Sequence, residues 1–169
     1  MRALVFKRHG GPDQVAFADV PRPALKADEI LVQVHAAGLN QADNKTRSGE
    51  MKALLRLELP ATLGSDLAGV VVEVGRSVTR FKPGDAVFAS IFGLRGGALA
   101  EFTVVPESAA APKPGRLDFV QAASIPMVGL TSWQALKERV NLRARQKVFI
   151  PAGSGGVGTQ GIALALEVL

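Results

Sequence analysis

The chain has 169 residues, of which 47% are hydrophobic and 21% charged, and it contains no cysteine. These values are typical of a globular chain that buries a core without cross-links, and they exclude disulfides and thiolate metal sites. The 20 Lys and Arg residues outnumber the 15 Asp and Glu residues, which gives a net charge of +5 and favours anionic ligands such as a phosphorylated nucleotide.

The first 115 residues are predicted to be mainly β-structure. Alternating apolar and polar residues, separated by Gly and Pro turns, predict short strands in this region. These strands cover residues 1–8, 15–20, 29–37, 66–75, 85–90 and 99–105. Many short strands with such turns favour a sandwich or a barrel. Residues 47–59 interrupt the series and are expected to form a loop or short helix that borders a cleft.

The pattern changes to helix and strand after Pro114-Gly115. A short helix is predicted over 118–123 and a longer one over 129–140, where apolar residues recur at helical spacing. Residues 147–152 then predict a short buried strand, and residues 159–169 a further helix. Between these two lies Gly153-Ser154-Gly155-Gly156-Val157-Gly158, which satisfies G-x-G-x-x-G.

A glycine loop between a strand and a helix is typical of the start of a dinucleotide-binding unit. One glycine permits a tight turn, one lets a pyrophosphate approach the backbone, and one lets the helix pack close to the strand. The helix start then offers unpaired N–H groups to phosphates. We therefore expect the cofactor-binding residues to be Ser154, Gly155, Gly156, Val157 and Gly158. A plain turn is the other interpretation of this loop.

Six collinear segments together resemble the medium-chain dehydrogenase/reductase superfamily, in its zinc-independent quinone-oxidoreductase branch. The segments are residues 37–43, 63–71, 74–75, 81–87, 129–136 and 152–158. The resemblance implies a mixed α/β fold. A GroES-like β-barrel would occupy residues 1–115, and the first strand, loop and helix of an incomplete Rossmann domain would occupy residues 116–169.

The resemblance also implies an activity, namely NADPH-dependent reduction of a quinone or of an α,β-unsaturated carbonyl by hydride transfer. NADP(H) is the expected cofactor, and Thr131 would lie near the nicotinamide. As an alternative, Thr131 supplies a hydroxyl at a helix start. The residue that distinguishes NAD from NADP follows the second Rossmann strand, which lies beyond residue 169. Glu167 comes too early for that role.

No catalytic zinc is expected. Asn40 resembles the position of a zinc-ligating cysteine in related alcohol dehydrogenases, and Gly64-Ser65-Asp66 replaces their Gly-His-Glu motif. The two histidines, His9 and His35, have no partner at metal-ligand spacing. We interpret both as strand or turn residues.

Without a metal, a substrate carbonyl must be polarised by hydrogen-bond donors or a cation. Asn40 and Lys45 are the candidate catalytic residues. Asn40 also fits a helix cap, and Asp43 fits either a cap or a group that orients a neighbour. Lys45 resembles a lysine of the enone-reducing subgroup, but it also fits a phosphate contact or an exposed helical lysine. Relatives that reduce quinones often carry tyrosines near residues 45–51, whereas this chain has no tyrosine.

A non-catalytic barrel module, or a truncated relative that acts through protein association, remains the alternative function. Only one strand and one helix of the Rossmann unit are predicted, so this form is expected to bind NADPH weakly and to be nearly inactive. The apolar residues of the last helix favour a homo-oligomer. No apolar run reaches membrane length and no signal peptide or basic–aromatic patch is evident. We expect a cytoplasmic location, with neither membrane nor nucleic acid as a partner.

Overall fold

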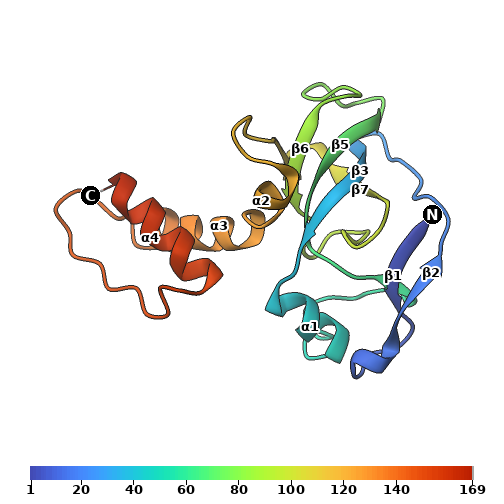
Figure 1. Cartoon of the computed structure of the whole chain (residues 1–169), viewed down its shortest axis with the longest axis horizontal. Coiled ribbons are helices and arrows are strands. Elements are labelled where there is room, and N and C mark those ends of the chain that lie inside the picture. Colours follow the sequence, from blue (N-terminus) through green and yellow to red (C-terminus); the bar gives the residue numbers. More distant parts are fainter. Residues whose placement is uncertain (169) are drawn as a thin grey trace. The chain divides into compact units, whose positions relative to one another are not determined.

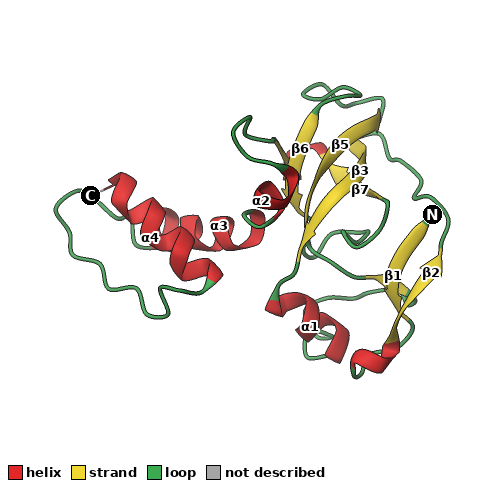
Figure 2. Ribbon diagram, viewed as in Figure 1, coloured by secondary structure: helices red, strands yellow, loops and turns green. Residues whose placement is uncertain are grey.

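A computed structural model describes residues 1–168 of the chain (Figure 1). The chain divides into two compact units, residues 1–124 and residues 125–169. Strands are confined to the first unit, and the described part of the second unit contains helices and connecting segments (Figure 2).

The first unit is built from two antiparallel sheets. One has the order β2-β1-β4 and the other β7-β3-β5-β6-β8, and a bridge between Ala3 and Ala100 links the first strand to the chain before β7. The strands are β1 (Arg2–Phe6), β2 (Val15–Asp19), β3 (Glu29–Gly38), β4 (Ala61–Thr62), β5 (Asp66–Val74), β6 (Ala86–Ser90), β7 (Phe102–Pro106) and β8 (Ala110–Pro112). Short helices are η1 (Pro12–Gln14), α1 (Gln41–Ser48), η2 (Glu107–Ala109) and α2 (Phe119–Ala123).

β3 and β5 form the centre of the larger sheet and supply much of its core. The β3–β5 register shifts twice, between Leu31 and Val32 and between Val34 and Ala36, and such irregularities bend a strand. Gly69 of β5 lies so close to β3 that an added Cβ would stand 2.1 Å from the Gln33 carbonyl oxygen. The buried core comprises Ile30, Val32, Leu67, Val71, Phe81, Val87, Ala89, Ile91, Ala98, Val105 and Ala110.

Helix α2 packs on the larger sheet through small residues. Ala122 and Ala123 form a buried cluster with Ala68 of β5. The helix begins after Asp118, whose carboxylate accepts a 2.7 Å hydrogen bond from the Gln121 backbone N–H, while the Gln121 side chain accepts one from the Asp118 N–H. This reciprocal capping box explains why the helix predicted over 118–123 forms at that point.

The second unit consists of α3 (Pro126–Trp133), a π-helical segment, η3 (Gln134–Arg139), and α4 (Gly156–Val168). Ser132 of α3 is buried, and its hydroxyl lies 2.9 Å from the Val128 carbonyl oxygen and 2.8 Å from that of Val157 in α4. This shared hydroxyl joins the two helices. Both helices predicted in this region are confirmed, although each begins three residues earlier than expected.

The strand predicted over 147–152 is wrong. Residues 146–150 have no regular structure and residues 151–154 form turns. The side chain of Phe149 is 88% exposed, so this segment is not buried either. A parallel strand exists only beside another strand, and residues 125–168 supply no second one.

All six strands predicted before residue 106 are confirmed, with ends that differ by up to three residues. The sequence patterns missed β4 and β8, because strands of two and three residues are too short to show alternation. Across residues 1–168, the structure contains no helix long and apolar enough to span a membrane.

Candidate functional site

The start of α1 is held against the start of β5 by a cluster of polar side chains. Asn40 occupies the N-cap position, and its backbone N–H donates a 2.8 Å hydrogen bond to Oδ2 of Asp43. The other Asp43 oxygen accepts a 2.5 Å hydrogen bond from the Ser65 hydroxyl. The Asn40 side-chain amide donates to Asp66 across 3.1 Å. Asp43, Ser65 and Asp66 are buried.

Both interpretations of Asp43 are therefore confirmed, because one carboxylate caps the helix and orients a neighbour. Asn40 sits at the cap position, where it forms a capping box with Asp43, and its side-chain amide also donates to Asp66. A side-chain amide carries two N–H donors, and the bond to Asp66 engages one of them. The half-buried amide thus has the chemistry to donate a hydrogen bond to a carbonyl oxygen.

Lys45 lies in the last turn of α1 and is exposed. A cation at this end of a helix complements the helix dipole. Among the described residues, its ammonium group makes no hydrogen bond or ion pair, and neither Lys45 nor Asn40 lines the recess described next. The structure brings Asn40, Asp43, Ser65 and Asp66 together but does not bring Lys45 into contact with them.

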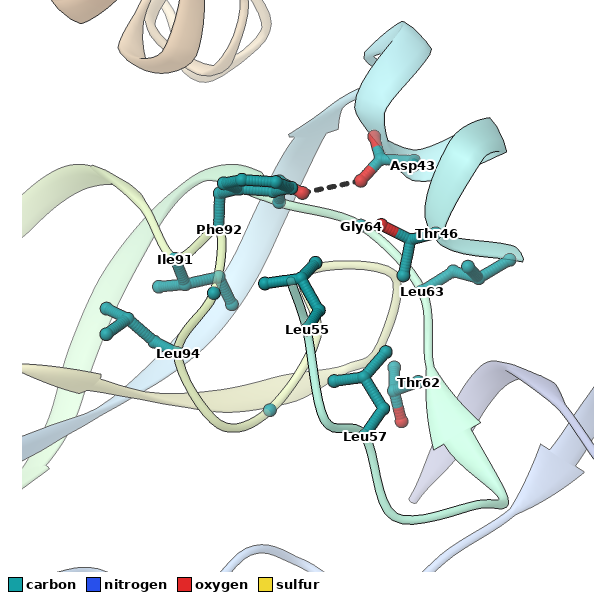
Figure 3. Close-up of a pocket in the computed structure, with 13 residues that line it drawn as sticks. Asp43, Thr46, Leu55, Leu57, Thr62, Leu63, Gly64, Ile91, Phe92 and Leu94 are labelled. Atoms are coloured by element: carbon teal, nitrogen blue, oxygen red, sulfur yellow. Dashed lines mark hydrogen bonds between the residues drawn. The ribbon is translucent and has the colours of Figure 1, made fainter. Parts of the chain in front are cut away.

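A small recess opens beside the polar cluster (Figure 3). Its cavity volume is ≈ 30 Å³, which is room for about two water molecules. Asp43, Thr46 and Ser65 supply polar groups, and the Ser65–Asp43 hydrogen bond is the dashed line in Figure 3. The apolar lining is Leu55, Leu57, Leu63, Ile91, Phe92 and Leu94.

The glycine loop of the second unit combines one closely packed glycine with one open glycine. Gly158 is buried, and a Cβ there would lie 2.3 Å from the Ala152 carbonyl oxygen, so only glycine fits. Gly155 is exposed, and the nearest atom to a Cβ there would be 3.4 Å away. Glycine at 158 therefore serves close packing within the loop, whereas glycine at 155 leaves an open backbone surface.

The other candidate cofactor residues lie around this loop. Ser154 lies in an exposed turn, Gly156 is the first residue of α4, and Val157 is 45% exposed. Thr131 lies inside α3, where its hydroxyl donates a 2.7 Å hydrogen bond to the Met127 carbonyl oxygen. Its interpretation as a helix-start hydroxyl is wrong, because α3 begins five residues earlier at Pro126.

The histidines have structural contacts. The Nδ1 atom of His9 lies 3.0 Å from the Thr46 carbonyl oxygen, and the His35 ring stacks on Phe119 with centroids 4.4 Å apart. Within residues 1–168, no three His, Asp or Glu side chains are grouped so that they could hold a metal ion.

Comparison with known proteins identifies the family to which this fold belongs. The alcohol dehydrogenase GroES-like domain family matches residues 26–115. The chain belongs to this family, and its homologues are quinone and alkenal oxidoreductases of the medium-chain dehydrogenase family.

Three relatives illustrate the similarity. A quinone-oxidoreductase homolog, chloroplastic, of Spinacia oleracea is 37% identical over 98% of this chain and 52% of its own length. An NADPH-dependent alkenal/one oxidoreductase, chloroplastic, of Arabidopsis thaliana is 39% identical over 99% of this chain and 45% of its own. The crystal structure of an alcohol dehydrogenase superfamily protein from Novosphingobium aromaticivorans superposes with a TM-score of 0.92 and 39% identity, over 99% of this chain and 50% of that one. The chain spans about half the length of these relatives.

Sequence reasoning missed the apolar part of the recess. Ile91, Phe92 and Leu94 come from the connection between β6 and β7, which carries no periodic signal. Leu55 and Leu57 lie in the segment that was expected to border a cleft, and that expectation is confirmed. Two signals pointed to Ser65 and Asp66, namely their place in a family segment and the replacement of Gly-His-Glu, but neither signal showed that they bond to Asp43 and Asn40.

Proposed function

We propose that this chain carries the carbonyl-binding part and the phosphate-binding loop of an NADPH-dependent, zinc-independent reductase of quinones or α,β-unsaturated carbonyls. The observation that carries this proposal is the open backbone at Gly155 beside the closed packing at Gly158, in a chain whose relatives include an NADPH-dependent alkenal/one oxidoreductase. When bound, NADPH supplies the hydride.

The residues of the chain bind the cofactor and stabilise the charge that develops on the substrate. Ser154, Gly155, Gly156, Val157 and Gly158 bind the pyrophosphate through backbone N–H groups. Thr131 lies near the nicotinamide ring of the bound cofactor. The Asn40 amide, oriented by Asp66, donates a hydrogen bond to the substrate oxygen as negative charge develops there. Lys45 contributes a long-range positive charge or a phosphate contact.

The binding experiment compares glycine variants in an NADPH titration followed by cofactor fluorescence. The wild-type chain is expected to bind weakly, with a Kd of about 1 mM, which corresponds to about 4 kcal/mol. Gly155→Ala should keep the helical circular dichroism and weaken binding at least about tenfold, since a methyl group would meet the phosphate. Gly158→Ala should lose helicity and binding together, because its Cβ collides with the backbone.

Gly115→Ala is the matched control, because a Cβ at that position meets nothing within 4 Å. It should bind NADPH like the wild type. If Gly155→Ala also binds like the wild type, the loop does not hold the phosphates and the cofactor proposal fails. Sustained reduction of 2-cyclohexen-1-one at micromolar NADPH would instead contradict weak binding and low activity.

The alternative, a protein that acts through association, is favoured by the apolar side chains on the second unit. Leu130 is 52% exposed, Phe149 88% and Leu166 73%. Exposed apolar surface of this kind promotes association, so a homo-oligomer is part of the proposal. A purely monomeric species in light scattering at high concentration would contradict it. We propose a cytoplasmic location, although the two plant relatives are chloroplastic proteins.

A further inference from the structure

One wall of the recess is the loop of residues 91–98, which is hydrogen-bonded to the neighbouring backbone at its two ends. The Ile91 N–H donates to the Ser65 carbonyl, and the Ala98 N–H donates to the Gly64 carbonyl. Between them, among the described residues, the one backbone hydrogen bond made within the loop joins the Leu94 N–H to the Ile91 carbonyl. Yet Phe92 and Leu94 of this loop line the recess (Figure 3).

Arg95 anchors the middle of the loop to the start of β3. Its Nε donates a 2.8 Å hydrogen bond to Oε1 of Glu29, and its Nη2 donates to Oε2 of the same carboxylate. Nη2 also donates to the Ala24 carbonyl. This is the bidentate geometry that a guanidinium group can form with a carboxylate and an ammonium group cannot.

The anchor point is itself fixed. The Glu29 side chain is only 4% exposed, and its Oε2 also accepts a 2.9 Å hydrogen bond from the Lys26 N–H. The Glu29 carbonyl accepts from the Gly75 N–H, so the backbone carrying the carboxylate is held at the start of β3, an interior strand of the larger sheet.

Glycines flank the anchored residue. Gly93 has φ +75° and Gly96 has φ +92°, which is the left-handed region that glycine adopts without strain. These two residues let the loop reverse direction so that Arg95 reaches Glu29 while Leu94 faces the recess. The same freedom means that the loop depends on the Arg95 side chain for a fixed shape.

We propose that Arg95 is a positioning residue that holds Phe92 and Leu94 as a rigid wall and thereby limits the size of the substrate group that the recess admits. The size limit rests on the proposed function, because it takes the recess as the substrate site. The rigid wall itself does not depend on that assignment.

Hydrogen exchange of the full 169-residue chain tests the wall. Arg95→Met removes the anchor, and the double variant Glu29→Gln with Arg95→Met removes it without leaving a buried charge unpaired. In both, the Leu94 amide should exchange at least about tenfold faster, whereas the Ala98 and Leu99 amides at the loop end stay protected. Arg95→Lys should lie between, and Lys82→Met, which breaks an exposed ion pair outside the recess, should change nothing.

A uniform rise in the amide exchange rates over the whole first unit would show that Arg95 stabilises the fold in general and not the loop in particular. An unchanged exchange rate at Leu94 would show that Arg95 does not hold the loop in place. Either result overturns the proposal. The double variant keeps the test valid if Arg95→Met does not fold.

Affinity measurements test the size limit with two probes, propenal, which has four heavy atoms, and 2-cyclohexen-1-one, which has a ring, titrated into the chain by NMR. The wild type should prefer the smaller probe, and in the double variant this preference should fall by about fivefold or more. An unchanged preference overturns the size limit. If neither probe binds the wild type while Leu94 still responds to the variants, the substrate assignment fails and the rigid wall stands.

Discussion

Glu29 has an unusual environment for a carboxylate, because it is buried at the start of an interior strand and is paired with Arg95. The hydrogen bond from Arg95 is the main reason that its pKa lies below the ordinary value of 4.5, and burial acts in the opposite direction. A carboxylate with a lowered pKa stabilises the folded state above its ordinary pKa, and this contribution is lost as the pH falls through the pKa of the folded state.

The free energy of unfolding of the wild type should therefore fall more steeply between about pH 5 and pH 3 than that of Glu29→Gln. Urea denaturation followed by circular dichroism at several pH values measures both slopes. The exposed carboxylates contribute equally to the two proteins, so the difference isolates Glu29. Parallel curves would show that the ion pair with Arg95 does not stabilise the fold.

Thr103 is the opposite case, a buried polar group without a partner. It is 1% exposed in β7, and its hydroxyl has no hydrogen-bond partner among the described residues. A buried unsatisfied hydroxyl costs about 1–3 kcal/mol, and valine has nearly the same shape and a high strand propensity.

Thr103→Val is thus expected to raise the free energy of unfolding by about 1 kcal/mol in urea denaturation. Thr103→Ser, which keeps the hydroxyl and loses the methyl group, should be less stable than the wild type. A destabilised valine variant would mean that the hydroxyl is satisfied, for example by a bound water.

At the scale of the element, α1 depends on one carboxylate. Asp43 accepts hydrogen bonds from the Asn40 backbone N–H and from the Ser65 hydroxyl, and it is buried. Its removal loses a helix cap and leaves two donors unsatisfied next to the recess.

Asp43→Ala should lower the free energy of unfolding by about 2–3 kcal/mol, and Asp43→Asn, which keeps an acceptor oxygen, by about 1 kcal/mol. Glu50→Ala is the control, since Glu50 is exposed just beyond the end of the same helix and should change stability by less than about 0.5 kcal/mol. Equal effects of the alanine variants at 43 and 50 would contradict the role of the cluster.

At the scale of the whole molecule, the two units differ in how their connecting segments are held. Residues 49–55 carry backbone hydrogen bonds such as Lys52 N–H to Gly49 and Leu55 N–H to Met51, and Leu55 lines the recess. Between η3 and α4, the backbone of residues 147–151 makes no backbone hydrogen bond within the described chain. The exposed basic residues of that connection are Arg143, Arg145 and Lys147.

Limited trypsin digestion is therefore expected to cut first within residues 143–147 and to leave a fragment that keeps the β-sheet circular dichroism of the first unit. Mass spectrometry identifies the first cut. Initial cleavage at Lys52, which is also exposed, would contradict this order of local stability.

The sequence by itself determined six of the strands, the helices after residue 115 and the glycine loop, because these follow from short-range periodicity and from turn residues. The sequence also predicted that Asn40 and Asp43 lie at the start of a helix. Their bonds to Ser65 and Asp66 were not predicted, since those partners lie more than 20 residues away.

Only the tertiary structure decided three further points. Residues 147–152 carry a strand-like pattern but form no strand, because strand formation needs a neighbour and not only a propensity. The recess wall comes from an aperiodic loop, and its anchor joins Arg95 to Glu29 across 66 positions. Pairing of strands and anchoring of loops depend on groups that meet only when the chain folds, which is why local patterns could not reveal them.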